Sequence, residues 1–319
     1  MTTLRRSSSS YGGFADGVII RGMPLLTLYP GNVYWVDSNG GGGSRGTFTH
    51  PVATLLEAHD LCTTDNGDII VIKPGHAETI TATVDFSKSG FAIIGTGFGF
   101  NRPTFTNGIT ATGDDAFDFA GDDIVVYNIK WKDAAPAGSA VVVFNVSGDN
   151  FHIENCYIQM GGKTTHFLTH DTTGKTHLEV INNTVVGTAA GPDAGVKIEK
   201  HHNYARIEGN IWQFGQSAGI DTGVVVFVSG IGGGSVIQNE ICLGTSSGTT
   251  GRYLVQTVAQ IDSLIQNCSF CGDDATIALG ASTASGFGFI MNMATEPGKG
   301  VPAVVDVTGV YPINTTPAV

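Results

Sequence analysis

Two acidic side chains are spaced in a way that could support catalysis. Asp171 and Glu199 lie 28 residues apart, which is the period of an internal repeat in this chain. If successive repeats stack as strands, the two carboxyls would lie roughly 5 Å apart, the separation that a retaining glycosidase uses. Asp171 and Glu199 are therefore the catalytic candidates. Four histidines lie near them in the sequence: His166, His170, His201 and His202.

The same residues have an interpretation without catalysis. Lys197 and Lys200 flank Glu199 and would neutralise it through ion pairs on the surface. Two carboxylates one repeat apart also arise easily in any repeated sequence. The surface ion-pair interpretation is favoured, and with it a protein that is not an enzyme.

An asparagine recurs at nearly constant spacing, each time inside a short apolar run. A repeat of this length indicates stacked copies of one small unit. The runs at 140–146 and 223–228 suit strands with one buried face. We therefore predict a parallel β-helix in which stacked amides form a structural ladder. The ladder consists of six residues spaced 27 to 29 positions apart: Asn128, Asn155, Asn183, Asn210, Asn239 and Asn267.

Acidic and amide residues also mark a second bend of each repeat. Asp123, Asn150 and Asp262 each lie five residues before a repeating asparagine, so they share one position of the coil. Asp and Asn tolerate positive φ and bond locally to the backbone. We predict turn residues here rather than catalytic ones.

Composition restricts the partners. The formal net charge is −12, and only 14% of the 319 residues are charged. Without a basic stripe the chain has no surface for phosphate backbones, so nucleic acid is not an expected partner. The apolar run at 18–29 is broken by Arg21 and Pro24. Neither a membrane span nor a secretory signal is therefore expected.

The cysteines predict neither disulfides nor a cofactor site. Cys156 and Cys268 lie four turns apart, roughly 19 Å at about 4.8 Å per strand, and a disulfide needs Cα atoms within about 7 Å. Cys268 and Cys271 form a CxxC, but no second pair at finger-like spacing accompanies it. We expect reduced core and turn residues, without metal or cofactor.

The chain divides into four parts. Residues 1–32 form an extended arm with isolated apolar anchors, and 33–90 form an N-terminal cap. Coils of about 28 residues fill 91–295, and an extended tail occupies 296–319. The cap should contain a helix that covers the open end of the coils. Its start is indicated by Thr49 and Pro51, and its buried face by Val52, Leu55, Leu56 and Cys62.

Residues 33–80 read VYWVDSNGGGGSRGTFTHPVATLLEAHDLCTTDNGDIIVIKPGHAETI. This order of strand, glycine-rich turn, helix and GDIIVIKPG segment is similar to the opening module of pectin-lyase-like proteins. The resemblance covers about 33–293 and implies an all-β fold: a single-stranded right-handed parallel β-helix with an N-terminal capping helix and extended ends. That fold hosts lyases, hydrolases, epimerases and non-catalytic virion proteins, so it does not define activity.

The calcium-and-arginine pattern of pectate lyases is not visible. Such a lyase needs several carboxylates around a hard cation and a basic residue to take a proton. The arginines within the coils, Arg102, Arg206 and Arg252, are not accompanied by stacked acids. A calcium-dependent lyase is therefore not expected.

The arm and the compact set of coils resemble structural proteins of tailed bacteriophages. The resemblance implies a capsid-decorating or cement protein on the outer surface of the head. It would be a homotrimer, made in the host cytoplasm and located in the virion, in contact with the major capsid protein or other virion proteins. The arm residues expected to touch the capsid are Arg5, Arg6, Tyr11 and Phe14.

One alternative is a tailspike-type carbohydrate-active enzyme or a glycan-binding protein that acts on host surface polysaccharide. It would need aromatic platforms for sugar rings beside its acids. Trp131 and Trp212 lie three coils apart, so they do not form an adjacent platform. Glycan stays open as a partner.

Overall fold

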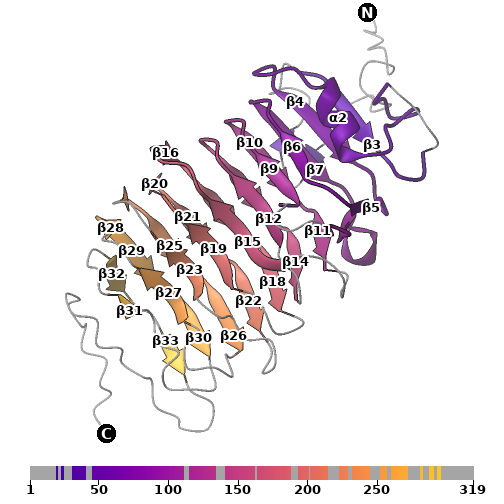
Figure 1. Ribbon diagram of the computed structural model, residues 1–319. Helices are drawn as coiled ribbons and strands as arrows, with labels where there is room; N and C mark the ends of the chain where they lie inside the picture. The colour runs from indigo at the N-terminus through magenta and orange to yellow at the C-terminus, as the bar shows by residue number, and fades with distance from the viewer. Residues whose placement is uncertain are drawn as a thin grey trace, which may run out of the picture.

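The computed structural model shows a chain wound into a stack of coils, in which each coil adds one strand to several parallel sheets (Figure 1). Among the described residues, β1 (Ile19–Ile20) and β2 (Met23–Pro24) form the sole antiparallel pair. The fold is a right-handed parallel β-helix, as predicted. The structure describes residues 19–20, 23–24, 31–40, 45–110, 115–133, 141–161, 164–187, 193–200, 202–214, 223–228, 232–244, 252–256, 260–271, 281–282, 287–290 and 293–295.

Sheet 1 has ten strands in stack order. They are β3 (Val33–Val36), β4 (Asp68–Ile72), β7 (Phe91–Gly95), β10 (Ile124–Tyr127), β13 (His152–Glu154), β17 (Glu179–Ile181), β21 (Arg206–Glu208), β25 (Val236–Gln238), β29 (Ser263–Gln266) and β32 (Phe287–Ile290).

Sheet 2 has nine strands and follows sheet 1 in each coil. They are β5 (Ala77–Ile80), β8 (Thr104–Asn107), β11 (Lys130–Lys132), β14 (Tyr157–Met160), β18 (Thr184–Gly187), β22 (Ile211–Phe214), β26 (Ile241–Gly244), β30 (Ser269–Cys271) and β33 (Met293–Thr295).

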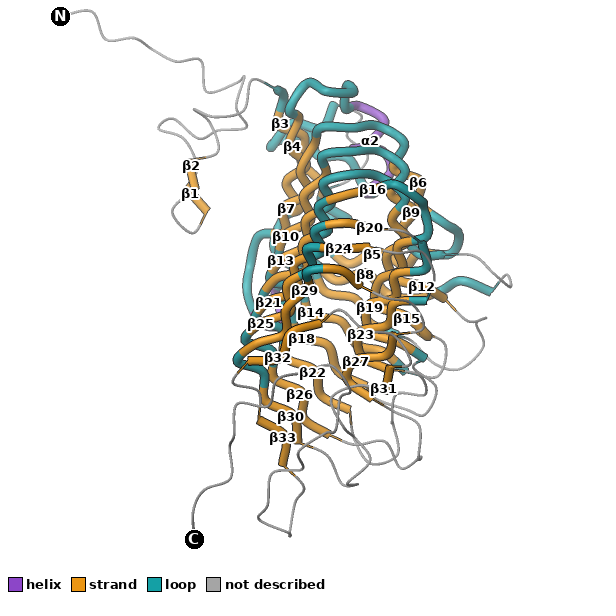
Figure 2. The backbone as a smooth tube through the Cα atoms, turned by 90° about the vertical axis from the view of Figure 1, so that its left-hand side faces the viewer, coloured by secondary structure: helices purple, strands orange, loops and turns teal. Residues whose placement is uncertain are grey.

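Sheet 3 has eight strands, and the short sheet 4 has four, which lie between sheet 3 and the next strand of sheet 1 (Figure 2). Sheet 3 contains β6 (Val84–Phe86), β9 (Phe117–Phe119), β12 (Val141–Val146), β15 (Thr164–His170), β19 (Ala194–Ile198), β23 (Gly223–Phe227), β27 (Arg252–Gln256) and β31 (Ala281–Ser282). Sheet 4 contains β16 (Lys175–Thr176), β20 (His202–Asn203), β24 (Gly232–Gly233) and β28 (Gln260–Ile261).

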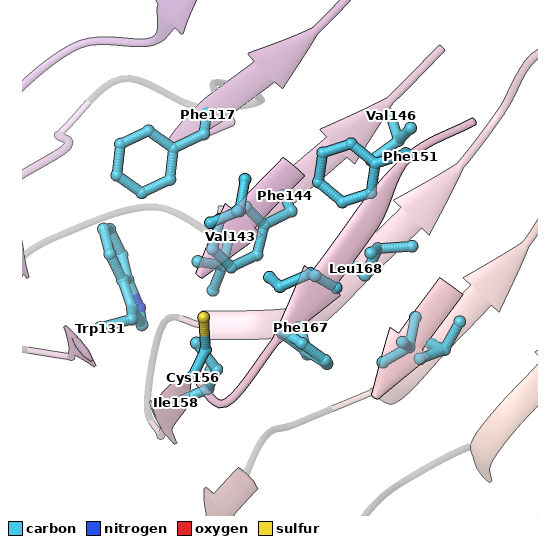
Figure 3. Packing of buried hydrophobic residues seen from close by; sticks show 14 of the residues in the cluster. Phe117, Trp131, Val143, Phe144, Val146, Phe151, Cys156, Ile158, Phe167 and Leu168 are labelled. Atoms are coloured by element: carbon cyan, nitrogen blue, oxygen red, sulfur yellow. The ribbon is translucent and has the colours of Figure 1, made fainter. Parts of the chain in front are cut away.

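In-register stacking fills the interior with apolar side chains from successive coils. Val126 pairs with Ile153, which pairs with Val180 in the next strand, and all three are fully buried. Aromatic rings from successive strands of sheet 3 also stack in the interior (Figure 3): the ring centroids of Phe117 and Phe144 lie 5.5 Å apart. Each coil therefore depends on its neighbours for burial, which makes the shaft cooperative and stiff.

The cap contains the helix α2 (Leu55–Leu61), which lies at the N-terminal end of the stack (Figure 1). It starts later than Thr49 and Pro51 indicated, because Thr54 and Glu57 form a reciprocal capping box. The Thr54 hydroxyl accepts from the Glu57 amide at 3.2 Å, and the Glu57 carboxylate accepts from the Thr54 amide at 3.1 Å. The prediction of a buried Leu56 is wrong, since this side chain is 40% exposed.

The bend before each strand of sheet 1 has the backbone conformation that its residue types predicted. Asp123, Asn150 and Asp262 have φ of 56°, 54° and 51°. Asn150 also donates from Nδ2 to the Asp123 carboxylate at 2.8 Å. The prediction of a shared turn position is confirmed for these three residues.

Candidate functional site

The predicted acidic pair lies on the outward side of sheet 3, at the ends of two neighbouring strands. β15 pairs with β19 so that His170 lies opposite Ile198, and Asp171 and Glu199 follow directly. The amide of Asp171 donates to the Val146 carbonyl at 3.4 Å, and that of Glu199 donates to the His170 carbonyl at 2.8 Å. The structure therefore brings the two residues into one column, one coil apart.

Lys197 occupies this surface together with the acids. Its Nζ lies 2.5 Å from the Glu199 carboxylate, and both side chains are partly exposed. The Asp171 carboxylate accepts from the Thr172 hydroxyl at 3.1 Å. Glu199 is thus neutralised by its neighbour, the arrangement that the surface ion-pair interpretation predicts.

The nearby histidines do not gather around the pair. His166 lies on the outward side of sheet 3, with Nε2 3.1 Å from the Asp193 carboxylate. Burial lowers the pKa of His166, although Asp193 acts in the opposite direction. His170 is buried and packs edge-on against His202, with ring centroids 4.3 Å apart. His201 lies outside the described residues.

A column of polar side chains crosses the same side of sheet 3. Backbone pairing places its members on successive strands: Asp85, Asp118, Asn145, Thr169 and Lys197. Asn145 Nδ2 lies 3.5 Å from the Asp118 carboxylate. Burial raises the pKa of Asp118, and the negative charges of Asp85 and Asp171 raise it further.

We call the outward set Asp85, Asp118, Asp171 and Glu199 the acidic face. A half-buried carboxyl with a raised pKa holds its proton to higher pH than an ordinary carboxyl does, the property of a general acid. Sequence reasoning missed Asp118. The signal was the repeated pattern VDF at 84–86 and FDF at 117–119, where one acid stands between two inward apolar residues.

The six predicted ladder asparagines fall into two columns, not one. Four of them have positive φ at the first residue of the turn between sheets 1 and 2: Asn128, Asn155, Asn239 and Asn267. In the two middle coils Asn182 and Gly209 take that place, with φ of 54° and 67°. Asn183 and Asn210 lie one residue later, where both are fully buried.

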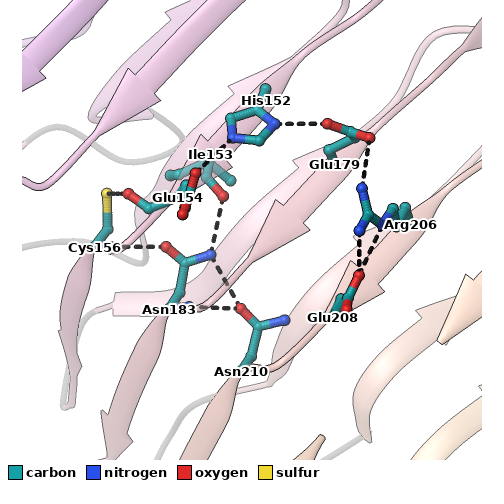
Figure 4. A network of polar contacts seen from close by, with 9 residues as sticks. All are labelled: His152, Ile153, Glu154, Cys156, Glu179, Asn183, Arg206, Glu208 and Asn210. Atoms are coloured by element: carbon teal, nitrogen blue, oxygen red, sulfur yellow. Dashed lines mark hydrogen bonds and ion pairs between the residues drawn. The ribbon is translucent and has the colours of Figure 1, made fainter. Parts of the chain in front are cut away.

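The second column forms a continuous chain of buried hydrogen bonds (Figure 4). Asn183 Oδ1 accepts from the Cys156 amide at 2.9 Å. Asn183 donates from its backbone and from Nδ2 to Asn210 Oδ1, at 2.8 and 3.0 Å. Asn210 in turn donates from both groups to Glu240 Oε1, at 2.9 and 3.0 Å. We call Asn183, Asn210 and Glu240 the buried polar column.

Glu240 ends this column in the core, and sequence reasoning did not single it out. Its second carboxylate oxygen accepts from Trp212 Nε1 at 2.5 Å and from the Tyr253 hydroxyl at 3.2 Å. The residue is fully buried. Burial raises the pKa of Glu240 to about 7, and the four donated hydrogen bonds limit that rise.

Sheet 1 carries a charged network on its outward side (Figure 4). His152 Nδ1 lies 2.7 Å from the Glu179 carboxylate, and Arg206 bridges Glu179 to Glu208. These partly exposed pairs neutralise one another and leave no concentrated charge for a ligand.

The structure offers no metal centre in the part of the chain that it describes: no group of three or more His, Cys, Asp or Glu residues is placed to hold an ion there. Cys156 and Cys268 are buried thiols outside any disulfide, and burial raises the pKa of each to about 12. Cys271 lies in β30, and its side chain is outside the described residues.

The predictions for the two ends of the chain fall on residues that the structure does not describe. The arm residues Arg5, Arg6, Tyr11 and Phe14 lie outside the described residues, as does the tail at 296–319. Within the described part, no helix is long and apolar enough to cross a membrane.

No protein-family model matches the sequence, and no curated protein matches it. Among solved structures, the chain is similar to a rhamnogalacturonan lyase, with 13% identity over 76% of this chain and 74% of that one and a TM-score of 0.44. A pectin methylesterase from carrot has 16% identity over 87% of this chain and 87% of that one, with a TM-score of 0.45. A GH136 lacto-N-biosidase from Eubacterium ramulus has 12% identity over 83% of this chain and 68% of that one, with a TM-score of 0.40.

These TM-scores are below 0.5, so the likenesses carry no argument about activity. The class of protein follows from the coils themselves: ten parallel rungs of sheet 1, with sheets 2 and 3 beside them, define a parallel β-helix protein. Because one fold can host many functions, the function of this protein depends on the surfaces of the shaft.

Proposed function

We propose that the chain is a virion structural protein of a tailed phage, a capsid-decorating or cement protein that stands on the outer surface of the head. One observation carries the proposal. The outward side of sheet 2 carries neighbouring apolar side chains on two strands: Ile211 in β22 and Ile241 in β26 share one register column, between Thr184 and Ser269. A stiff shaft with an apolar strip along part of its length suits assembly with other proteins.

The apolar strip suits contact between copies of the chain. Ile241 is 40% exposed, and Leu243, which points to the same side two residues later, is 43% exposed. Both belong to β26, next to Ile211 in β22. We propose that this strip packs in a homotrimer; the number three follows from the resemblance to phage proteins, and closed symmetry is the usual form of such contacts.

The arm supplies the proposed contact with the shell. Arg5 and Arg6 would pair with acidic groups of the major capsid protein, while Tyr11 and Phe14 would fill apolar pockets. A flexible or extended segment that is ordered on binding can cover a large surface in this way. The body would then be held on the head by its N-terminal end.

Light scattering after size exclusion tests both parts of the proposal, with and without purified heads that lack this protein. We expect the full chain to elute as a trimer and to co-elute with heads. Deleting residues 1–30 should abolish co-elution and preserve the trimer. The double variant Ile241→Ser and Leu243→Ser should yield monomers, while Ile261→Ser, at a side chain 53% exposed on β28, is the matched control. Failure of the full chain to co-elute with heads would contradict the proposal.

A second function is favoured by Asp118 alone. Its raised pKa beside Asp85 and Asp171 suits a general acid that protonates a glycosidic oxygen, while an ionised neighbour activates water or attacks the sugar. The chain would then cleave host surface polysaccharide. Release of reducing ends by the full chain, lost on Asp118→Asn and retained on Glu154→Gln, would support this reading. Absence of cleavage by the full chain on the host's polysaccharide would remove it.

A further inference from the structure

The turn between sheet 1 and sheet 2 is longest in one coil near the N-terminal end of the shaft. In the six coils from β10 to β29, the turn between sheet 1 and sheet 2 has two residues, as between Tyr127 and Lys130. Between β7 and β8 it has eight, residues 96–103. Insertions into otherwise uniform repeats commonly form binding loops. We call residues 96–103 the aromatic loop.

The aromatic loop presents two phenylalanines to solvent. Phe98 is 66% exposed and Phe100 is 93% exposed, the two highest values among the large apolar side chains that the structure describes. They stand in the sequence GFGFN, where Gly97 and Gly99 have φ of 98° and 59°. An apolar ring as exposed as that of Phe100 costs free energy that burial against a partner protein would recover.

The loop is fixed to the shaft rather than loosely attached. Asn128 donates from Nδ2 to the carbonyls of Gly95 and Gly97, at 2.8 and 3.0 Å. The Gly75 amide donates to the Asn101 carbonyl at 2.8 Å. A short 3-10 helix, η1 (Gly99–Asn101), closes the tip. A preorganised loop loses little conformational entropy on binding, so its exposed rings can contribute fully to affinity.

The position of the loop relates it to the arm. β7 is two strands from β3, the first strand of the shaft, so the loop lies roughly 10 Å along the axis from the rung where the arm joins the body. The arm joins at the start of β3 and the loop follows the end of β7, so they lie at opposite ends of these parallel strands. The apolar strip that we assign to contacts between copies lies in β22 and β26, toward the other end of the stack (Figure 1). The two apolar surfaces are therefore separate.

We propose that the aromatic loop is a docking site of the body on the phage head, with Phe98 and Phe100 seated in apolar pockets of the shell protein. This inference rests on the proposed function. Arm and loop would engage one surface together, and each would raise the effective concentration of the other. A lipid surface is a poorer partner, because the chain carries a formal net charge of −12 and anionic headgroups would repel it.

Co-sedimentation with purified heads that lack this protein tests the proposal. The variant Phe98→Ser and Phe100→Ser should bind about 10-fold more weakly or worse, as expected for the loss of two anchoring rings. Tyr204→Ser, at a side chain 55% exposed on another edge of the shaft, should bind within about two-fold of the unchanged chain. Both variants alter exposed side chains, and equal thermal melts would show that both fold.

The outcomes separate the two proposals. If the unchanged chain binds heads and the double phenylalanine variant binds equally well, the docking role of the loop is overturned while the proposed function stands. If the unchanged chain does not bind heads, both are overturned. A change from trimer to monomer in the double variant would assign the loop to contacts between copies. Flotation of the unchanged chain with neutral phosphatidylcholine vesicles, lost in the variant, would assign it to lipid. Either result would overturn docking on the shell.

Discussion

The buried polar column and the acidic face use the same kinds of side chain in opposite surroundings. Glu240 is fully buried and receives four hydrogen bonds, from Asn210, Trp212 and Tyr253. Glu199 is partly exposed and has a lysine at 2.5 Å. Burial makes every donor around Glu240 depend on that one carboxylate, whereas water can replace Lys197 beside Glu199. The comparison separates a carboxylate that holds buried donors in place from one whose partner water can replace.

The largest effect should follow removal of the buried carboxylate. Glu240→Ala leaves donors on Asn210, Trp212 and Tyr253 without an acceptor, and each unsatisfied buried group costs about 1–3 kcal/mol. We expect the free energy of unfolding to fall by about 3 kcal/mol or more in chemical denaturation. Glu199→Ala is the matched control and should lose less than about 1 kcal/mol. Equal losses would show that burial does not distinguish the two sites.

The pH dependence of stability should identify the same carboxylate. Its pKa is about 7 in the folded chain against an ordinary value of 4.5. Between these values the folded state binds the proton more tightly, so this contribution is fully present below pH 4.5 and is lost as the pH rises through 7. The loss amounts to about 3 kcal/mol at 1.36 kcal/mol per unit. Glu240→Gln should flatten that part of the curve, and an unchanged slope would assign it to other groups.

The two asparagine columns should respond differently to substitution. Asn183→Leu leaves the Cys156 amide without its acceptor and removes one of the two hydrogen bonds to Asn210 Oδ1, which should cost about 1–3 kcal/mol. Asn239→Gly should cost less than about 1 kcal/mol, because Asn239 has φ of 57° and glycine adopts that conformation freely. Gly209 already occupies the equivalent place one coil earlier. Thermal melts of both variants measure the difference, and similar shifts would contradict the division into two columns.

The smallest effect concerns the acidic face itself. Asp171→Asn removes one of the charges that raise the pKa of Asp118 and should lower that pKa with little change in stability. Titration of the Asp118 carboxyl by NMR checks this shift. Thr172→Ala, which leaves both charges in place, serves as the control. If the pKa of Asp118 is the same in Asp171→Asn as in the unchanged chain, burial and Asp85 would be its only causes.

The coil architecture could be read from the spacing of the asparagines, because one small unit repeated at 27 to 29 residues has few ways to bury its apolar side. The division of the asparagines into two columns could not be predicted from that spacing. Asn182 and Asn183 are adjacent, and Gly209 precedes Asn210, so a period alone leaves the phase uncertain by one residue. That single residue decides whether an amide points into the core or lies in the turn.

Two further features escaped sequence reasoning for physical reasons. Glu240 follows Asn239 and resembles an ordinary polar turn residue, since its buried donors include Trp212 from the preceding coil and Tyr253 from sheet 3. Phe98 and Phe100 resemble core residues by type, and only the three-dimensional turn shows that they face solvent. Asp118 was hidden because it lies 33 residues after Asp85, outside the regular period.

Cryo-electron microscopy of heads incubated with the full chain tests the central claim most directly. The account predicts threefold clusters of shafts on the outer surface of the head, each with its cap and aromatic loop toward the shell and its C-terminal coils pointing away. Heads that remain bare at saturating protein, or shafts attached by their C-terminal coils, would contradict it.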